Sequence, residues 1–473
     1  MPERIPAGWL IGGAVAVLLP AAFFLAYTRP IFFTSPTFLG GLIVLECLIA
    51  AVCAYRRAFF PLVLIAFLFA GTELPVGGGW IVGRWIFLAT GAMVGSFMML
   101  KERRHHFGLF HALATFSVLA AVVSAAVSRY PSIALLKSCS LFLLFVYAGT
   151  GVRLAVTGHE NRFFAGLLKG TEIFVALLTL LYLAGDQVMG NPNSLGAVMA
   201  VLAPVLLWGT LLESSPFVRR RRLLLFGISM FLTFHSYSRA GMVASLATCG
   251  LLCLVLRRYK LLGQGVVILL IFATAYALVA PEAFSKMVSD LNADIVYKGK
   301  DADLGLLQSR RSPWQGAMDS IRAHPWFGSG FGTTDNGQDA SADLTAFETT
   351  EKATRENGSS YLTITTWVGI LGVVPFIFLL VLLLWKVVRT LLWMLGTGNP
   401  SHPAVPLAMV VIAGLIHATF EDWLFAPGYY LCVFFWSMAF VLADVAPWAA
   451  LPSFSRAWRP RLMRSGVGVA PSR

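Results

Sequence analysis

A succession of apolar stretches, each about 20 residues long, governs what this chain can fold into. A helix of that length crosses the hydrocarbon core of a bilayer and satisfies its own backbone hydrogen bonds there. Charged residues make up only 12% of the chain, whereas a soluble chain carries about 25%. The sequence therefore predicts an all-α integral membrane protein, a polytopic helical bundle of roughly 12–14 transmembrane helices.

The predicted spans follow one another closely, except for one long polar interruption. They are 8–27, 37–54, 59–75, 80–100, 107–127, 132–152, 163–184, 193–212, 223–237, 240–256, 262–280, 359–385, 404–420 and 424–445. The first span is too long for a cleaved signal peptide. A loop as long as the interruption is usually functional or disordered. We therefore divide the chain into an N-terminal transmembrane bundle, a large loop with short helices, C-terminal transmembrane helices and a basic tail: 1–280, 281–357, 358–445 and 446–473.

Lysine and arginine collect in alternate connections and in the tail, so the net charge of +13 has a topological cause. Cytoplasmic loops gather these residues, which predicts that both termini are cytoplasmic and that the large loop is outside. Three shorter polar motifs fall on the same outer face. They are Gly190–Asn193, His235–Gly241 and Phe420–Trp423. The chemistry is therefore expected on that face.

Within the large loop, Ser312 and Pro313 predict the start of a helix, as its N-cap and first residue. His324, followed by proline, predicts its end. Arg310 and Arg311 would then stand just before a helix N-terminus, whose free N–H groups and dipole favour an anion. The sequence predicts a phosphate or pyrophosphate site there, and two solvated arginines are the alternative.

Other ionisable residues lie where predicted spans meet the outer surface. Arg239 sits between two closely spaced spans, and an ionisable group at the membrane is a candidate functional residue. Arg84 supports the same argument with less force, and snorkelling to lipid phosphate is the alternative for such residues. Glu421 and Asp422 could form an acid pair or cap a helix.

Two further features of the loop are a glycine-rich segment and a glutamate near its end. The segment Gly328–Gly332 follows no predicted strand, so it indicates a tight turn that approaches another element rather than a dinucleotide site. Glu356 beside Arg355 could be a general base at the membrane surface, or a member of a structural ion pair. The outer face lacks the clustered spacing of metal ligands, so we expect no metal and no cofactor.

Taken in order, these motifs resemble the O-antigen ligase and polymerase superfamily of bacterial membrane glycosyltransferases. The matching segments are Asn191–Asn193, Ser238–Gly241, Ser309–Trp314, His324–Gly332, Asn357 with Ser360–Leu362, and Gly369–Gly372. The resemblance implies a multi-pass protein of the bacterial inner membrane. It also implies metal-independent transfer of a glycan from an undecaprenyl-pyrophosphate donor to an acceptor hydroxyl at the periplasmic face, as in a ligase or polymerase. The implied partners are the donor, a glycan or lipid acceptor and the bilayer, and nucleic acid is not among them.

The resemblance also suggests roles for individual residues. Pyrophosphate-binding arginines of the family correspond to Arg239 and to Arg310 or Arg311, and Asn193, Asn357, Tyr361 and His324 lie in its motifs. This chain departs from the family where Glu356 stands in place of the histidine proposed as base, with extra spacing before Tyr361, and where Trp367 replaces an acid that commonly precedes the Gly-x-x-Gly motif. Glu356 could replace that histidine, or the departure could mark another acceptor or lost activity.

The rival function from another class is a transporter or flippase of lipid-linked oligosaccharides. Transporters tend to carry inverted repeats and charges at the bilayer midplane. The charges of this chain gather instead at span ends and in the loop, which favours the enzyme.

Overall fold

The computed structural model describes residues 36–72, 77–102, 107–184, 188–189, 191–279, 281–282, 285, 308–333 and 358–447, and these residues contain no β-strand. The helices of the N-terminal part are α2 (Pro36–Ala70), α3 (Gly77–Glu102), α4 (Leu109–Val127), α5 (Pro131–Tyr147), the π-helical turn η2 (Ala148–Val152), α6 (Arg153–Val156) and α7 (Glu160–Leu183). The remainder are α8 (Pro192–Leu212), α9 (Pro216–His235), α10 (Arg239–Val255), α11 (Tyr259–Val279), α13 (Gln308–Ala323), α15 (Ser360–Thr397), α16 (Ala404–Ala418) and α17 (Tyr430–Val445). The predicted all-α membrane fold is confirmed.

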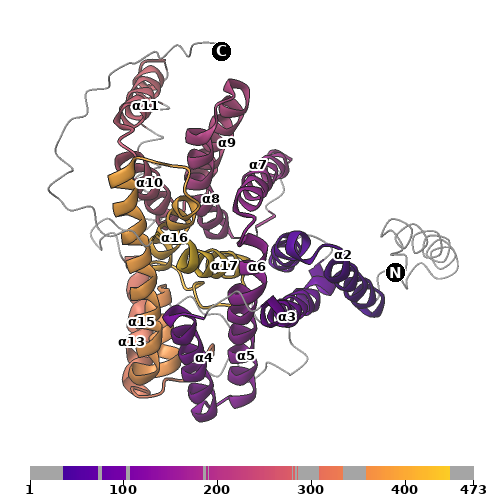
Figure 1. The fold of residues 1–473 in the computed structure, drawn as a ribbon. Coiled ribbons are helices and arrows are strands. Elements are labelled where there is room, and N and C mark those ends of the chain that lie inside the picture. The colour runs from indigo at the N-terminus through magenta and orange to yellow at the C-terminus, as the bar shows by residue number, and fades with distance from the viewer. Residues whose placement is uncertain are drawn as a thin grey trace, which may run out of the picture.

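Three helices form the centre of the bundle. Nearly every residue of α8, α16 and α17 is buried, and Figure 1 shows α16 and α17 enclosed by the other helices. A helix that is apolar all round is typical of a buried position. Helices such as α9 and α11 instead turn large aliphatic side chains outward, as a lipid-facing helix does. The core therefore consists of the C-terminal helices together with α8.

The predicted spans agree with the helices in type but not at every boundary. Six of the described helices are long and apolar enough to cross a membrane, and four more apolar helices are shorter. Non-helical backbone at Ala54 interrupts α2 where the first of its two predicted spans ends. The span 8–27 lies outside the described residues, so the number of spans stays a prediction.

Three boundaries were predicted wrongly, and one of them is the end of α15, which lies at Thr397 rather than at 385. The helix α9 begins at Pro216 rather than at 223, and it includes Arg219–Arg222. Arginine is a good helix former and proline is favoured in a first turn, so the basic run extends the helix instead of forming a loop. The predicted span 424–445 begins at Tyr430, which leaves residues 419–429 as a connection between α16 and α17.

A break within α15 organises one end of the molecule. Gly369 has φ 69° and ψ −179°, a conformation that only glycine adopts easily. The segment that follows α13 fills the gap with backbone hydrogen bonds: Ser329 N–H donates to Thr366 O (3.1 Å), Gly330 N–H to Trp367 O (3.1 Å), Ile370 N–H to Pro325 O (2.7 Å) and Leu371 N–H to Trp326 O (3.2 Å). Such irregular backbone is tolerated in membrane proteins only where protein groups satisfy it. The glycine-rich segment is therefore the predicted close-approach turn, and its target is this break.

Replacing Gly369 with alanine is expected to destabilise the protein. A Cβ at Gly369 would lie 2.4 Å from the backbone of Trp326, which cannot move as a flexible side chain could. Backbone strain costs about 1–3 kcal/mol, and overpacking adds about 1–3 kcal/mol. The measurement is the thermal unfolding midpoint in detergent. Gly316→Ala, in α13 with open space around its Cα, is the matched control and should leave the midpoint unchanged or raise it, and an equal response of the two variants would contradict the expectation.

Candidate functional site

The polar motifs predicted to share one face do meet at one end of the bundle. Helices α8 and α10 cross closely at their beginnings, because a Cβ on Gly241 would lie only 2.8 Å from Gly196 O. Small residues allow such an approach between membrane helices. The Ser238 hydroxyl accepts the Gly241 N–H at 3.2 Å and caps α10. Arg239 is thereby placed at the first position of α10, half-buried, beside the beginning of α8.

Arg310 of α13 forms an ion pair with Glu421, which lies in the connection between α16 and α17. The two side chains are 13% and 9% exposed. The backbone carbonyl of Glu421 also accepts from Ser360 N–H at 3.0 Å and from the Ser360 hydroxyl at 2.6 Å. The beginning of α15 therefore fixes the acid that pairs with Arg310.

The beginning of α13 is also held by Gly358, which lies just before the start of α15. The Trp314 indole donates to Gly358 O at 3.1 Å. Gly358 also packs on the Arg310 side chain, since a Cβ there would lie 3.2 Å from Arg310 Cδ. Arg310 is therefore enclosed by α13, the start of α15 and the connection after α16.

Arg239 belongs to the same cluster. The positive charge of Arg310 acts on Arg239, so the two guanidinium groups lie within electrostatic range of each other. Glu421 compensates part of this charge, and a further anion between the two would be stabilised by guanidinium groups, which bind phosphate through two parallel hydrogen bonds. We call Arg239, Arg310 and Glu421 the arginine cluster.

Exchanging the two residues of the Arg310–Glu421 ion pair distinguishes a structural role of the pair from a role in binding. Breaking such a buried pair in Arg310→Ala or Glu421→Ala should cost about 3–5 kcal/mol. The double variant R310E/E421R is expected to recover folded protein but not activity, because the guanidinium has changed place. Folding is measured by size-exclusion chromatography and activity by glycan product. Recovery of both would show that the pair only supports the fold.

The helix start predicted at Ser312 is wrong. α13 begins at Gln308 and contains Pro313 as its sixth residue, where the proline removes the N–H that would otherwise bond to Ser309 O. Arg310 and Arg311 therefore lie in the first turn itself rather than ahead of it. Arg310 is half-buried and Arg311 is exposed. The predicted end is confirmed, because α13 stops at Ala323 and the exposed His324 follows.

Arg84 is a residue of α3 that contacts a different part of the connection between α16 and α17. It is buried in α3, donates to Gly428 O at 2.8 Å and faces the rings of Phe67 and Trp85 at 5.7 and 5.3 Å. Arg84 thus contacts the far end of the connection whose near end carries Glu421. Its predicted part in pyrophosphate binding remains a proposal.

The remaining predicted residues have mixed surroundings. The Tyr361 hydroxyl donates to Leu415 O at 2.9 Å and ties α15 to α16. Asn193 follows the N-cap of α8, where the Asn191 side chain accepts the Asn193 N–H at 2.8 Å. Glu356 and Asn357 lie outside the described residues.

His417 is a buried histidine with a neighbour in the arginine cluster. Its Nδ1 accepts the Trp423 indole N–H at 2.9 Å, and the charge of Arg310 acts on it. Sequence spacing gave no sign of this, because Arg310 and His417 are brought together only by the docking of α13. Sequence spacing likewise gave no sign of the contacts that Ser360 and Trp314 make.

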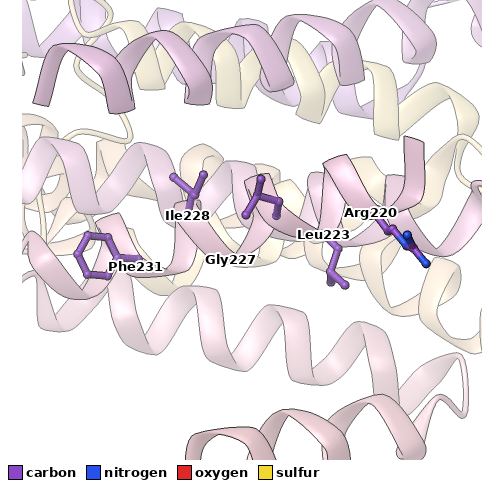
Figure 2. A pocket seen from close by; sticks show the side chains of 6 residues that line it. Arg220, Leu223, Gly227, Ile228 and Phe231 are labelled. Carbon is purple, nitrogen blue, oxygen red and sulfur yellow. The ribbon is translucent and has the colours of Figure 1, made fainter. Parts of the chain in front are cut away.

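A hollow on α9 is not lined by a comparable cluster of polar side chains. Its walls come from a single helix, from Arg220 to Phe231, and enclose about 560 Å³ (Figure 2). The side chains in view are aliphatic or aromatic except for Arg220 at one end. Ordinary lipid-facing helix surface explains it. Among the described residues no group of three or more His, Cys, Asp or Glu side chains could hold a metal ion.

Comparison with known families places the arginines in context. Residues 223–377 match the family model Wzy_C, described as O-antigen ligase. The matched stretch runs from α9 into α15 and contains Arg239, Arg310 and Arg311. No curated protein matches the chain. The match supports the O-antigen ligase and polymerase superfamily as the family of this chain, as its motifs predict.

Proposed function

We propose that the protein is a membrane glycosyltransferase that transfers or polymerises a glycan from an undecaprenyl-pyrophosphate-linked donor. The family match supports glycosyl transfer in general. The observation that carries the finer proposal is the arginine cluster, in which Arg310 pairs with Glu421 and the charge of Arg310 acts on Arg239. Two guanidinium groups and one carboxylate leave a net positive charge suited to a pyrophosphate.

In the proposed reaction the oxygen of the acceptor hydroxyl attacks the anomeric carbon of the donor. A bond forms between these atoms while the bond from the anomeric carbon to the pyrophosphate oxygen breaks. The leaving pyrophosphate takes the electron pair, and Arg239 and Arg310 stabilise its charge. Preorganised groups of this kind are usually the largest contribution to catalysis.

Glu356 is proposed to accept the proton of the acceptor hydroxyl. In the sequence it lies two residues before Gly358, which packs on Arg310. An ionised carboxylate can act as a general base toward a hydroxyl. Glu421 cannot serve as readily, because Arg310 already engages it.

The decisive experiment uses the purified full chain in liposomes with a lipid-linked glycan donor and a hydroxyl acceptor. Transfer should release undecaprenyl pyrophosphate and lengthen or glycosylate the acceptor. Movement of intact donor across the bilayer without release would identify a transporter instead. Donor used as its own acceptor would mark a polymerase, and use of a separate acceptor would mark a ligase.

The proposal places the arginine cluster on the periplasmic side of the inner membrane. Basic residues gather at other helix ends, where Arg221 and Arg222 pair with Glu172 and where Arg153 pairs with Asp444. Cytoplasmic ends of membrane proteins collect such residues. This distribution supports cytoplasmic termini and an outside loop.

Cysteine labelling tests this orientation. Asp301→Cys and Asp343→Cys, both in the loop, are expected to react with a membrane-impermeant thiol reagent in intact cells. Arg220→Cys at the basic end of α9 is the control and should react only after lysis. Labelling of the unmodified chain gives the background from its own cysteines. Protection of both loop positions until lysis would put the loop in the cytoplasm and remove the proposed function.

A further inference from the structure

A second cavity lies in a crevice between α2 and α7 that also touches α8 and α17. It encloses about 950 Å³, within the range of ligand pockets. Its walls are leucine, isoleucine, valine and phenylalanine side chains over most of their length. We call it the α2–α7 crevice.

The crevice runs along the helices rather than across them. On α2 its lining extends from Arg56 to Thr72, which corresponds to about 24 Å of helix. At one end it reaches Met189 and Tyr430, close to the beginning of α8. At the other end it reaches the beginning of α7. An extended hydrocarbon chain would fit this shape better than a compact ligand.

Basic residues line the crevice at the second end only. Arg56 and Arg57 come from α2, while His159 and Arg162 come from the beginning of α7, and all four line the crevice. Arg57 and Arg162 are exposed there. Basic residues alone would follow from topology, but here two separate helices place them at the mouth of an apolar slot.

We propose that the α2–α7 crevice binds an anionic phospholipid, with its phosphate at Arg57 and Arg162 and an acyl chain along the apolar walls. Basic pockets between membrane helices on the cytoplasmic side recognise such headgroups. Charge complementarity selects this occupant over the isoprenoid chain of a glycan donor, whose pyrophosphate belongs at the arginine cluster. The proposed headgroup site at Arg57 and Arg162 therefore shares no residue with the arginine cluster.

Two glycines provide a way to fill the crevice without disturbing its walls. Gly166 and Gly170 line it from α7, and a Cβ added at either meets no atom within 4 Å. Leucine at both positions would occupy the path of the acyl chain, and would also raise the helix propensity of α7. Gly227→Leu, in the hollow on α9, is the matched control because its Cα is equally open.

The test is native mass spectrometry of the full chain taken from nanodiscs that contain phosphatidylglycerol and phosphatidylcholine. We expect retained phosphatidylglycerol, reduced at least tenfold in R57Q/R162Q and in G166L/G170L, and unchanged in Gly227→Leu and in R219Q/R220Q. Size-exclusion chromatography confirms folding of each variant, and the two crevice variants perturb different groups.

Several results would overturn the proposal. Equal retention of both lipids would show that the basic residues do not select an anionic headgroup. Wild-type retention in R57Q/R162Q would place the bound lipid elsewhere. An absence of bound lipid in the full chain would mean that the crevice is empty or that another part of the chain fills it. Displacement of the lipid by a polyprenyl phosphate, with loss of glycan transfer in G166L/G170L, would assign the crevice to the donor instead.

Discussion

Arg239→Lys is expected to lower glycan transfer by about 10²–10³-fold at normal protein level, the usual cost of removing one preorganised group that faces the charge of a leaving group. Lysine keeps the positive charge but loses the planar fork that binds phosphate bidentately. Arg239 lies at the first position of α10, beside Arg310. The measurement is glycan product per folded protein, with donor binding assayed separately.

Arg257→Lys is the matched control for this variant. Arg257 lies just past the opposite end of α10 and is exposed, with its guanidinium near Leu395 O at 3.4 Å. The control should transfer glycan as the unmodified chain does. Full activity of Arg239→Ala would show that Arg239 only anchors the helix at the membrane surface.

Glu356→Gln is expected to lower glycan transfer by about 10²–10⁴-fold, the range that positioned general bases contribute. Glutamine keeps the size and most of the hydrogen bonding of glutamate but cannot accept the proton of the acceptor hydroxyl. Donor binding should persist, because Arg239 and Arg310 are untouched. Glu356→His should retain part of the activity, since imidazole can also accept a proton.

Glu351→Gln, elsewhere in the same loop, controls for the loss of one negative charge and should have little effect. If Glu356 instead formed a structural ion pair with Arg355, activity would fall only as far as the amount of folded protein falls. Normal turnover in Glu356→Gln would exclude it as the base. The proton would then pass to water or to another acid.

The helices could be predicted from the sequence because lipid imposes a simple rule on them. About 20 apolar residues must follow one another, and α4, α7 and α8 keep close to the predicted bounds. The rule is weaker at helix ends. Arg219–Arg222 continue α9 because charged side chains are good helix formers beyond the hydrocarbon core.

The candidate site could be predicted only in part. Arg239 and Arg310 could be identified as candidates because an ionisable group at a membrane boundary is costly and therefore indicates a function. The ion pair between Arg310 and Glu421 could not be foreseen, because these residues are separated by 111 positions in the chain. Neither Trp314 nor Ser360 carries a local signal for its hydrogen bond, since both bonds depend on how α13 docks on α15.

The docking of α13 has a consequence for how this protein can diversify. Trp314 and Arg310 secure one end of α13, and the turn at the break in α15 secures the other. Residues 334–357 therefore leave and rejoin the same rigid frame. Doubling the length of a loop costs only about 0.6 kcal/mol of closure entropy, so insertions in this segment would be nearly neutral for folding. Evolution can thus lengthen, shorten or recompose the segment while the arginine cluster stays in place.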